Sequence, residues 1–274
     1  MRQGLMRTGM AYFFMIVAAV LILLPFWIAV SNSFMTESES ATYPPRFLPS
    51  GINIDNFITV MNNIPIIRFI VNSFLTSSII TIGNLITSCM AAYAFAFLRF
   101  PGRKILFGLF MATMMIPWEV TVIPNYLTVR SWGWLDSYQG LTVPFLATAF
   151  GTFLMRQFFL QLPKELMEAA RIDGCGHIRI FASLAVPLSM PGLATLGIYS
   201  FLNHWNMYLW PLLITNSESM RTVQIGISML QFADVTAWNV VMAGIVLVML
   251  PSLVLLAVGL GRLVGGLTAG ALKG

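Results

Sequence analysis

The stretch "MAYFFMIVAAVLILLPFWIAVSNSF", Met10–Phe34, contains no Asp, Glu, Lys or Arg. A helix needs about 20 predominantly apolar residues to cross the hydrocarbon core of a bilayer, which is about 30 Å thick, and this stretch is long enough. A secretory signal peptide would have a shorter apolar region followed by a small-residue cleavage site, which the continuation "SNSFMTES" does not supply. We therefore interpret the stretch as a membrane-spanning helix.

The rest of the chain has the same apolar character. It is 58% hydrophobic and 9% charged, whereas an average soluble domain is about a quarter charged. Together with the first segment, six segments are long and apolar enough to span a bilayer, at about 10–34, 70–98, 105–126, 138–160, 186–214 and 240–262. The sequence therefore predicts an all-α integral membrane protein, a single transmembrane domain over 1–274 with six transmembrane helices.

Two of these segments have further features. The second contains "NSFLTSSIITIGNLITSC", whose Ser, Thr and Asn side chains favour contact with other helices over contact with lipid. The third contains Pro117 and Pro124, and we expect the helix to kink at both.

The distribution of basic residues predicts the orientation. If the N-terminus is placed in the cytoplasm, eleven of the 15 Lys and Arg residues fall on the cytoplasmic side of the membrane or near the cytoplasmic ends of the spans. They are Arg2, Arg7, Arg99, Arg103, Lys104, Arg156, Lys164, Arg171, Arg179, Arg262 and Lys273. The four others are Arg46, Arg68, Arg130 and Arg221. Because cytoplasmic loops are enriched in Lys and Arg, we expect both termini in the cytoplasm. The formal net charge of +5 then reflects topology and not nucleic-acid binding.

The sequence contains no recognisable motif for catalysis or cofactor binding. The sequence has no G-x-x-x-x-G-K-[ST] loop to hold ATP phosphates. Cys89 and Cys175 form no C-x-x-C pair, and His177 and His204 lie far from each other and from any Cys pair. We expect no catalytic residue, no metal site and no cofactor in this chain.

The stretch "PKELMEAARIDGCGHIRIF", Pro163–Phe181, is the most charged part of the chain. It lies in the predicted cytoplasmic loop 163–185, between the fourth and fifth spans. Pro163 suits the first position of a helix, and Gly174 suits a left-handed stop. We expect a second short helix from about His177 that ends before Pro187.

Side chains of this loop suit contact with a partner. Glu168 can pair with Arg171 at a spacing of three residues, while Ala169 and Ala170 allow another backbone to approach closely. These residues favour the interpretation that the loop is a binding surface for a soluble partner protein. An amphipathic helix lying on the membrane surface is the alternative that the residues alone leave open.

The segment "EAARIDGCGHIRIFASLAVP" is similar to the signature loop of permease subunits of binding-protein-dependent ABC importers. That loop reads E-A-A, three residues, G, nine residues and then I-x-L-P. Glu168, Ala169, Ala170 and Gly174 match it outright, while Leu184 and Val186 replace Ile and Leu before Pro187. The stretches "MIPWEVTVIP", "NMYLWPLLIT" and "GGLTAGALKG" resemble the maltose-type carbohydrate branch, so the resemblance covers nearly the whole chain.

This resemblance implies both a role and partners. The loop would form coupling helices that dock on an ATP-binding subunit, with Glu168 contacting a basic side chain there. The residues assigned to coupling are Glu168, Ala169, Ala170, Arg171, Asp173, Gly174 and Pro187. The implied assembly has a second permease, two ATP-binding subunits that hold ATP and Mg²⁺, and an extracytoplasmic substrate-binding protein, in a bacterial or archaeal cytoplasmic membrane.

A second group of residues is a candidate for the transport path. Glu119 falls in or near the end of a span, where a carboxylate is costly unless it is paired or hydrated. The aromatic and amide side chains of "WNMYLWP" could hold a sugar ring, or could belong to an aromatic belt at the membrane interface. These residues are Trp205, Asn206, Tyr208 and Trp210.

The substrate is open between two classes. The stretches "WGWLDSYQGLTVP" and "MYLWPLLIT" also resemble glycerol-3-phosphate permeases. A phosphate ester would favour cations along the path, and the predicted spans contain none in their interior, which favours a neutral carbohydrate. An ion-coupled secondary transporter is a more distant alternative, because only Glu119 could serve as its coupling carboxylate.

We expect single-cysteine labelling to confirm the orientation. In a variant lacking Cys89 and Cys175, a cysteine introduced by His177→Cys should react with a membrane-impermeant maleimide only after the cells are opened, because the loop faces the cytoplasm. Labelling of this position in intact cells would contradict the predicted topology. A cysteine at Arg46→Cys, in a loop expected outside, is the matched control.

Overall fold

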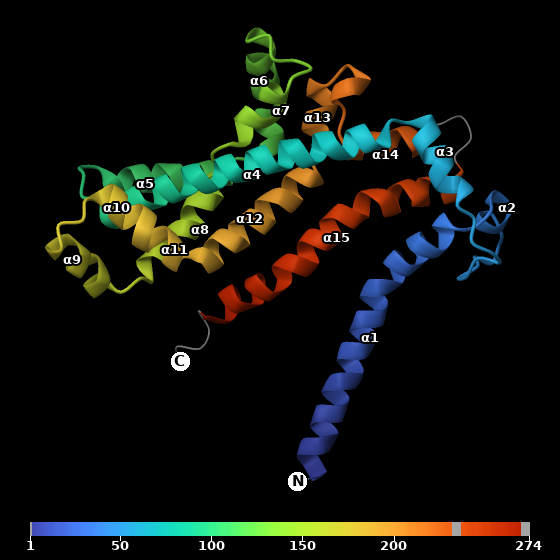
Figure 1. Cartoon of the computed structure of the whole chain (residues 1–274), viewed down its shortest axis with the longest axis horizontal. Helices are drawn as coiled ribbons and strands as arrows, with labels where there is room; N and C mark the ends of the chain where they lie inside the picture. The colour runs from blue at the N-terminus through green and yellow to red at the C-terminus, as the bar shows by residue number, and fades with distance from the viewer. Residues whose placement is uncertain (1, 232–236, 270–274) are drawn as a thin grey trace. The chain divides into compact units, whose positions relative to one another are not determined.

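The computed structural model describes residues 2–231 and 237–269, with side chains over 8–231 and 237–257. Within these ranges every regular element is a helix, which confirms the all-α prediction (Figure 1). The chain forms two compact units, Met1–Ile67 with Gly226–Leu250, and Arg68–Ile225 with Pro251–Gly274.

A buried asparagine organises the first unit. The unit contains α1 (Arg2–Ser33), α2 (Glu37–Ser40), α3 (Asp55–Asn63), most of α14 (Val223–Gln231) and the first part of α15 (Trp238–Ala269). The Asn56 Nδ2 atom donates hydrogen bonds of 2.8 Å to the carbonyl oxygens of Ser33 and Met35. Its Oδ1 atom accepts a hydrogen bond of 2.8 Å from Asn239 Nδ2. One amide therefore joins α3 to the end of α1 and to the start of α15.

The second unit contains the candidate sites. Its α-helices are α4 (Ile66–Phe97), α5 (Arg103–Ala112), α6 (Trp118–Ser131), α7 (Tyr138–Thr142), α8 (Ala149–Leu160), α9 (Lys164–Ile172), α10 (His177–Ile180), α11 (Val186–Leu188), α12 (Met190–Trp205), α13 (Leu209–Ile214) and the end of α15. A π-helical segment, Phe181–Ala185, lies between α10 and α11. Short 3-10 turns cover Thr113–Met115, Val143–Phe145 and Glu218–Met220.

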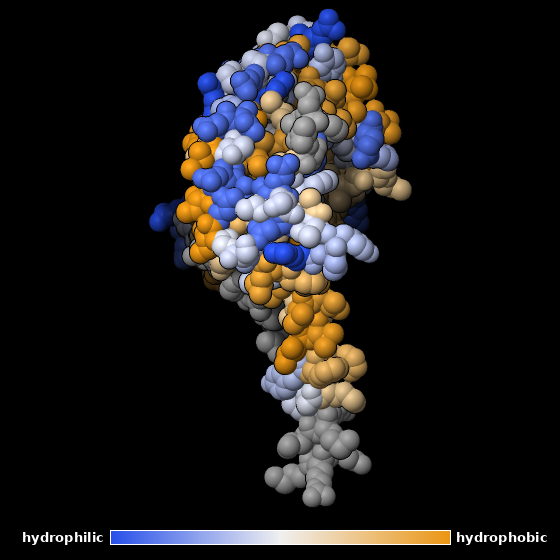
Figure 2. All heavy atoms as spheres, turned by 90° about the vertical axis from the view of Figure 1, so that its right-hand side faces the viewer, coloured by the Kyte–Doolittle hydropathy of each residue, from blue (hydrophilic) through white to orange (hydrophobic). Residues whose placement is uncertain are grey.

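Three helices are long and apolar enough to cross a membrane alone, namely Thr8–Ser33, Ile66–Phe97 and Trp238–Ala257. Three further pairs qualify only as bent pairs. Arg103–Met115 meets Trp118–Ser131 at 98°, Tyr138–Phe145 meets Ala149–Leu160 at 46°, and His177–Leu188 meets Met190–Trp205 at 75°. The third, fourth and fifth predicted spans therefore each coincide with a bent pair of helices and not with one straight helix. Many large apolar side chains are exposed, and on the face shown in Figure 2 orange spheres lie beside and below a blue, polar area.

The sharpest break lies at Pro117, as the sequence predicts. Ile116 is extended, with φ −83° and ψ 115°, and Pro117 precedes the first residue of α6. Proline disfavours a helical conformation in the residue before it, so the chain turns here. Pro124 lies inside α6, which continues on both sides of it, and a kink at this position stays a prediction.

The polar side chains of α4 face protein, as predicted. Six of them are buried: Asn72, Ser73, Thr76, Ser77, Asn84 and Ser88. Asn84 Oδ1 accepts hydrogen bonds from Ser88 Oγ at 2.8 Å and from Thr148 Oγ1 at 3.0 Å. At the other end of the helix, Asn72 Oδ1 accepts one of 2.7 Å from the Tyr138 hydroxyl. The polar side chains of α4 thus bind the segments around α7 and α8.

Gly151 should be required for this packing. A Cβ atom at position 151 would overlap Ser88 Oγ and lie 2.7 Å from Asn84 Oδ1 and 2.9 Å from Thr148 Oγ1. We expect Gly151→Ala to reduce the unfolding free energy by about 1–3 kcal/mol, since overpacking forces buried groups apart. A thermal unfolding assay that reports exposure of buried Cys89 would measure the change.

Gly108→Ala is the matched control, because a Cβ atom there meets nothing within 4 Å and alanine favours a helix. Equal stability of the two variants would show that the Asn84 contacts do not constrain the packing of α8 on α4.

Candidate coupling surface and transport path

The loop 163–185, the candidate for coupling, begins with α9, whose first residue is set by the local sequence. Pro163 directly precedes the helix, and Glu165 lies in its first turn. A carboxylate in the first turn interacts favourably with the helix dipole. The predicted helix is confirmed, with its first residue at Lys164, one position after the expected Pro163.

The end of α9 has the hydrogen bonds of a Schellman motif. The Cys175 amide donates to the Ala170 carbonyl at 2.9 Å, and the Gly174 amide donates to the Arg171 carbonyl at 3.0 Å. Gly174 has φ +77°, which confirms the predicted left-handed stop. Glycine adopts this conformation without the cost that a Cβ atom adds, so the residue fixes where the helix ends and how the chain leaves it.

The inner face of the loop packs on the second unit. Met167 and Ala170 of α9 and Ile180 of α10 are buried in one cluster with Cys89, Ala92, Tyr93, Met155, Phe159, Ala185 and Leu196. These partners lie on α4, α8, the π-helical segment and α12. Ala170 therefore faces the chain's own core, and Ala169 is the member of the Ala pair that stays exposed.

The outer face of the loop combines charge with exposed apolar residues. Glu165, Glu168, Arg171 and Asp173 are all exposed. Ile172 and Ile178 are each 85% exposed, although they lie in a polar segment. We call Glu168, Ala169, Ile172, Ile178 and Arg179 the outer surface of the loop. Such a mixture is typical of a docking surface, where apolar anchors supply affinity and charges supply specificity.

The predicted pair of Glu168 and Arg171 does not form. Among the side chains that the structure describes, the ion pair observed is Arg46 with Glu39, and it lies in the first unit. The Glu168 carboxylate is thus available to a partner. Its position one turn from the C-terminal end of α9 gives no favourable interaction with the helix dipole.

The segment after α10 differs from the prediction. The sequence suggests that the second helix ends before Pro187, but the chain stays helical through Leu188. The physical reason is the π-helical segment Phe181–Ala185, in which the Val186 amide donates to the Phe181 carbonyl. The extra residue per turn changes the hydrogen-bond register just before proline, which has no amide hydrogen.

A tyrosine that the sequence did not single out joins the loop to α4. The Tyr93 hydroxyl lies 3.2 Å from His177 Nδ1, and its ring packs edge-on against Phe181 at 5.3 Å between centroids. Nothing in the sequence distinguishes Tyr93 from other aromatics of an apolar helix. Ile172 and Ile178 were also not singled out from the sequence. Two isoleucines within a charged segment were a signal that could have indicated exposed apolar side chains.

The candidate path residues divide into buried and exposed groups. Trp205 and Trp210 are 1% and 0% exposed. Trp210 Nε1 donates a 3.0 Å hydrogen bond to the Gly140 carbonyl, and its ring packs against Trp118 and Phe145. These two tryptophans hold α13 and the end of α12 in place.

Three candidate path residues are exposed: Glu119, Asn206 and Tyr208. Glu119 lies in the first turn of α6, directly after the sharp break at Pro117. Asn206 Nδ2 donates to the Leu202 carbonyl at 2.8 Å, and its Oδ1 accepts from Gln224 Nε2 at 3.3 Å. They are therefore the members of the group that a substrate could contact.

Asp136 fixes the loop that precedes α7. Its Oδ1 atom accepts hydrogen bonds from the amides of Asn216 and Ser217, at 2.7 and 2.8 Å, and from Ser217 Oγ. Burial raises the pKa of the Asp136 carboxyl, but these hydrogen bonds outweigh that effect and hold the pKa below its ordinary value. The carboxylate therefore stays ionised and keeps the segment after α13 against the segment before α7.

No group of three or more His, Cys, Asp or Glu side chains that could hold a metal ion occurs in the part of the chain that the structure describes.

Residues 83–265 match the model of the family described as the inner membrane component of binding-protein-dependent transport systems. The chain belongs to this family. The family resemblance carried by the loop 163–185 is thereby confirmed, and a permease of this family is a transport protein and not an enzyme.

Curated relatives of this permease span nearly its whole length. It is 39% identical over 248 residues to the sn-glycerol-3-phosphate transport system permease protein UgpE of Yersinia pestis, covering 88% of each chain. It is 37% identical over 246 residues to the UgpE protein of Brucella abortus, covering 86% of this chain and 87% of the relative.

Solved structures share the fold. The permease matches a chain of a bacterial ABC transporter involved in the import of the acidic polysaccharide alginate, with a TM-score of 0.81 and 23% identity over 94% of this chain and 96% of that one. A second alginate transporter structure, in complex with a pentasaccharide-bound periplasmic protein, matches with a TM-score of 0.67 and 14% identity over 92% and 93%. These matches show that the broken helices belong to a known permease fold.

Substitution of Gly174 should loosen the end of α9 through backbone strain alone. A Cβ atom there meets nothing within 4 Å, so Gly174→Ala adds no clash and only the penalty of a left-handed alanine, about 1 kcal/mol. We expect trypsin to cut after Arg171 several times faster in this variant. Peptide analysis of timed digests would measure the rate.

Gly176→Ala is the matched control, because Gly176 has an ordinary φ of −72° and equally open surroundings. The same increase in cleavage for both glycines would mean that the left-handed turn does not hold the loop.

Proposed function

We propose that this permease is the membrane subunit of an ATP-driven importer and receives the work of ATP hydrolysis through α9 and α10. The carrying observation is the outer surface of the loop, which combines Glu168, without an ion pair among the described side chains, with two isoleucines that are each 85% exposed. An ATP-binding subunit with a basic side chain and an apolar groove would complement it. The amphipathic alternative is less favoured, because Met167 and Ala170 pack on protein.

The packing under the loop supports its proposed role in coupling. Because Met167, Ala170 and Ile180 share one cluster with residues of α4, α8 and α12, a displacement of the loop would move the ends of three helices together. Close-packed interiors transmit such displacements because they cannot deform continuously. Pro187 and the π-helical segment lie at the joint between the loop and α12, where a change of angle would be accommodated.

In the proposed assembly the whole chain acts as one transmembrane domain with both termini in the cytoplasm. It pairs with a second permease, two ATP-binding subunits and an extracytoplasmic binding protein, in the cytoplasmic (inner) membrane of a bacterium or archaeon. ATP and Mg²⁺ are held by the ATP-binding subunits. The family description supports the binding protein and the inner membrane.

For the substrate we propose sn-glycerol-3-phosphate or a closely similar phosphate ester. The support is the 37–39% identity to UgpE permeases across most of both chains. The second unit also brings two arginines to one loop: Arg68 Nε and Asn72 Nδ2 both donate to the Ser219 carbonyl, and Asn72 also donates to that of Arg221. In the proposed topology this loop faces outward, where cations would attract a phosphate.

A carbohydrate is the second candidate. It is favoured by the resemblance to the maltose-type branch and by the absence of cations from the middle of the predicted spans, since Arg156 lies near the end of the fourth. For either substrate we propose that Glu119, Asn206 and Tyr208 contribute to the path, because they are the exposed members of their group. A glycerol or sugar hydroxyl could donate to the Glu119 carboxylate.

Transport by the complete importer in proteoliposomes tests these proposals. Labelled sn-glycerol-3-phosphate should accumulate only with ATP on the side of the ATP-binding subunits and with the binding protein on the other. Glu168→Lys should lower uptake at least tenfold, since reversing one charge of a buried interfacial pair costs about 2–5 kcal/mol. Glu119→Gln should lower uptake a few-fold while stimulation of ATP hydrolysis by the binding protein is retained.

Each part of the proposal has its own contrary outcome. Uptake of a labelled oligosaccharide, with no uptake of the phosphate ester, would transfer the assignment to carbohydrates. Normal uptake by Glu168→Lys would show that the loop does not couple, and Glu165→Lys, on an exposed position of the same helix, is the control for charge alone. Uptake without ATP would favour an ion-coupled transporter.

A further inference from the structure

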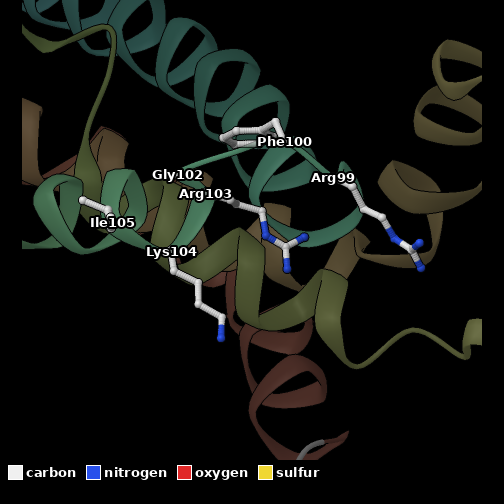
Figure 3. Close-up of a pocket in the computed structure, with 6 residues that line it drawn as sticks. All are labelled: Arg99, Phe100, Gly102, Arg103, Lys104 and Ile105. Atoms are coloured by element: carbon white, nitrogen blue, oxygen red, sulfur yellow. The ribbon is translucent and has the colours of Figure 1, made fainter.

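A basic hollow lies in the turn between α4 and α5, apart from the coupling surface and the path (Figure 3). Its volume is about 490 Å³. The residues that line it are Arg99, Phe100, Gly102, Arg103, Lys104 and Ile105. Three of these six are cations, so the hollow favours an anionic ligand.

These cations have no acidic partner among the residues that the structure describes. Arg103 Nη1 donates a 2.8 Å hydrogen bond to the Leu98 carbonyl, which fixes its side chain over the turn. Arg103 also acts electrostatically on Arg156 of α8, which is held by a hydrogen bond to the Phe95 carbonyl and by the face of Phe107 at 4.2 Å. The like charges repel one another, and an anion in the hollow would relieve that repulsion.

The backbone of the turn also favours an anion. Gly102 has φ +75° and precedes α5, and no side chain caps the first turn of that helix. A left-handed residue followed by the first amides of a helix presents several N–H groups to one point. Those amides and the helix dipole attract phosphate groups.

The hollow lies between two candidate spans, at the expected edge of the membrane region. α4 is a candidate span that ends at Phe97, and the first bent pair of helices begins at Arg103. The turn between two spans lies where hydrocarbon meets water. Phe97 and Leu98 pack against the cluster beneath the coupling loop, so this turn is at the same end of the unit as α9 and α10 (Figure 1).

Apolar surface continues directly from the cations. Ile105, Leu106 and Leu109 of α5 are 71%, 51% and 62% exposed. Behind the turn, Phe95 packs against Phe100, Phe107 and Phe110, with ring centroids 5.3 to 6.2 Å apart. The site therefore pairs a phosphate-binding end with an adjoining apolar surface, which fits a phospholipid better than free phosphate.

We propose that this hollow binds the headgroup of an anionic phospholipid. The phosphate lies among Arg99, Arg103, Lys104 and the first amides of α5, and an acyl chain follows the exposed apolar side of that helix. Basic pockets at the cytoplasmic ends of transmembrane helices are suited to such lipids. A bound lipid would neutralise the turn next to the coupling loop.

Native mass spectrometry of the purified full chain tests the proposal. With equal amounts of phosphatidylglycerol and phosphatidylcholine, the parent should retain phosphatidylglycerol preferentially. The double variant Arg99→Gln/Lys104→Gln should reduce that preference about 25-fold, since each basic residue at an anionic lipid surface contributes about a fivefold factor. Arg103 is left in place because it holds the Leu98 carbonyl.

Two further variants separate the local site from general charge. Lys164→Gln/Arg179→Gln removes two exposed cations of the coupling loop and should leave the preference within about twofold. Arg99→Lys/Lys104→Arg keeps the charge and should retain most of the preference. Millimolar inorganic phosphate should not displace the lipid.

Four results would overturn the proposal. They are equal retention of the two lipids by the parent, an equal loss in the Lys164 and Arg179 control, displacement of the lipid by inorganic phosphate, or cross-linking of a photoreactive group at position 104 to an ATP-binding subunit in place of lipid. The first needs no variant, so the proposal stays testable even if the double variant fails to fold.

Discussion

Asn84 lies in the middle of a 32-residue helix that is apolar enough to span a bilayer. An amide without hydrogen-bond partners in such a place costs about 2–7 kcal/mol, depending on the reference state. The second unit meets this requirement by bringing Ser88, Thr148 and Ser200 to the same side chain. The need to satisfy Asn84 and Asn72 inside protein fixes which face of α4 is buried, and α8 and α12 are positioned accordingly.

The breaks between helices impose the same requirement on backbone groups. A chain that interrupts a span exposes backbone amides and carbonyls, which is tolerated where protein or water satisfies them. Thr148 caps α8 through the Gly151 amide at 3.1 Å, and Thr87 Oγ1 donates to the Leu146 carbonyl at 2.7 Å. The break between the two halves of this pair is therefore covered by side chains of α4 and of the break itself. Exposed Glu119 follows another such break, where irregular backbone and a carboxylate can share a hydrated environment.

The end of the unit that includes α9 and α10 has buried and exposed side chains within a few residues of each other. Met167 and Ala170 hold α9 to the core, while Glu168 and Ala169 between them point outward. Because successive residues of a helix lie about 100° apart, neighbouring positions can have opposite tasks. The basic hollow between α4 and α5 lies at the same end of the unit, because Phe97 and Leu98 next to it pack on the cluster that also contains Met167 and Ala170. The outer surface of the loop and the basic hollow thus both rest on the same buried cluster.

The sequence by itself determined the helical membrane fold, the family, the polar face of α4 and the left-handed turn at Gly174. Each of these depends on local composition or spacing: long apolar segments, a motif of fixed length, or a glycine where a helix must end. Only the tertiary structure decided that Trp205 and Trp210 are buried, that Glu168 does not pair with Arg171, and that the helix continues past Pro187. An aromatic side chain suits a core and a substrate path equally well, and only its neighbours in space distinguish the two. The π-helical segment before Pro187, whose last residue Ala185 is buried in the cluster, is likewise not revealed by any spacing in the sequence.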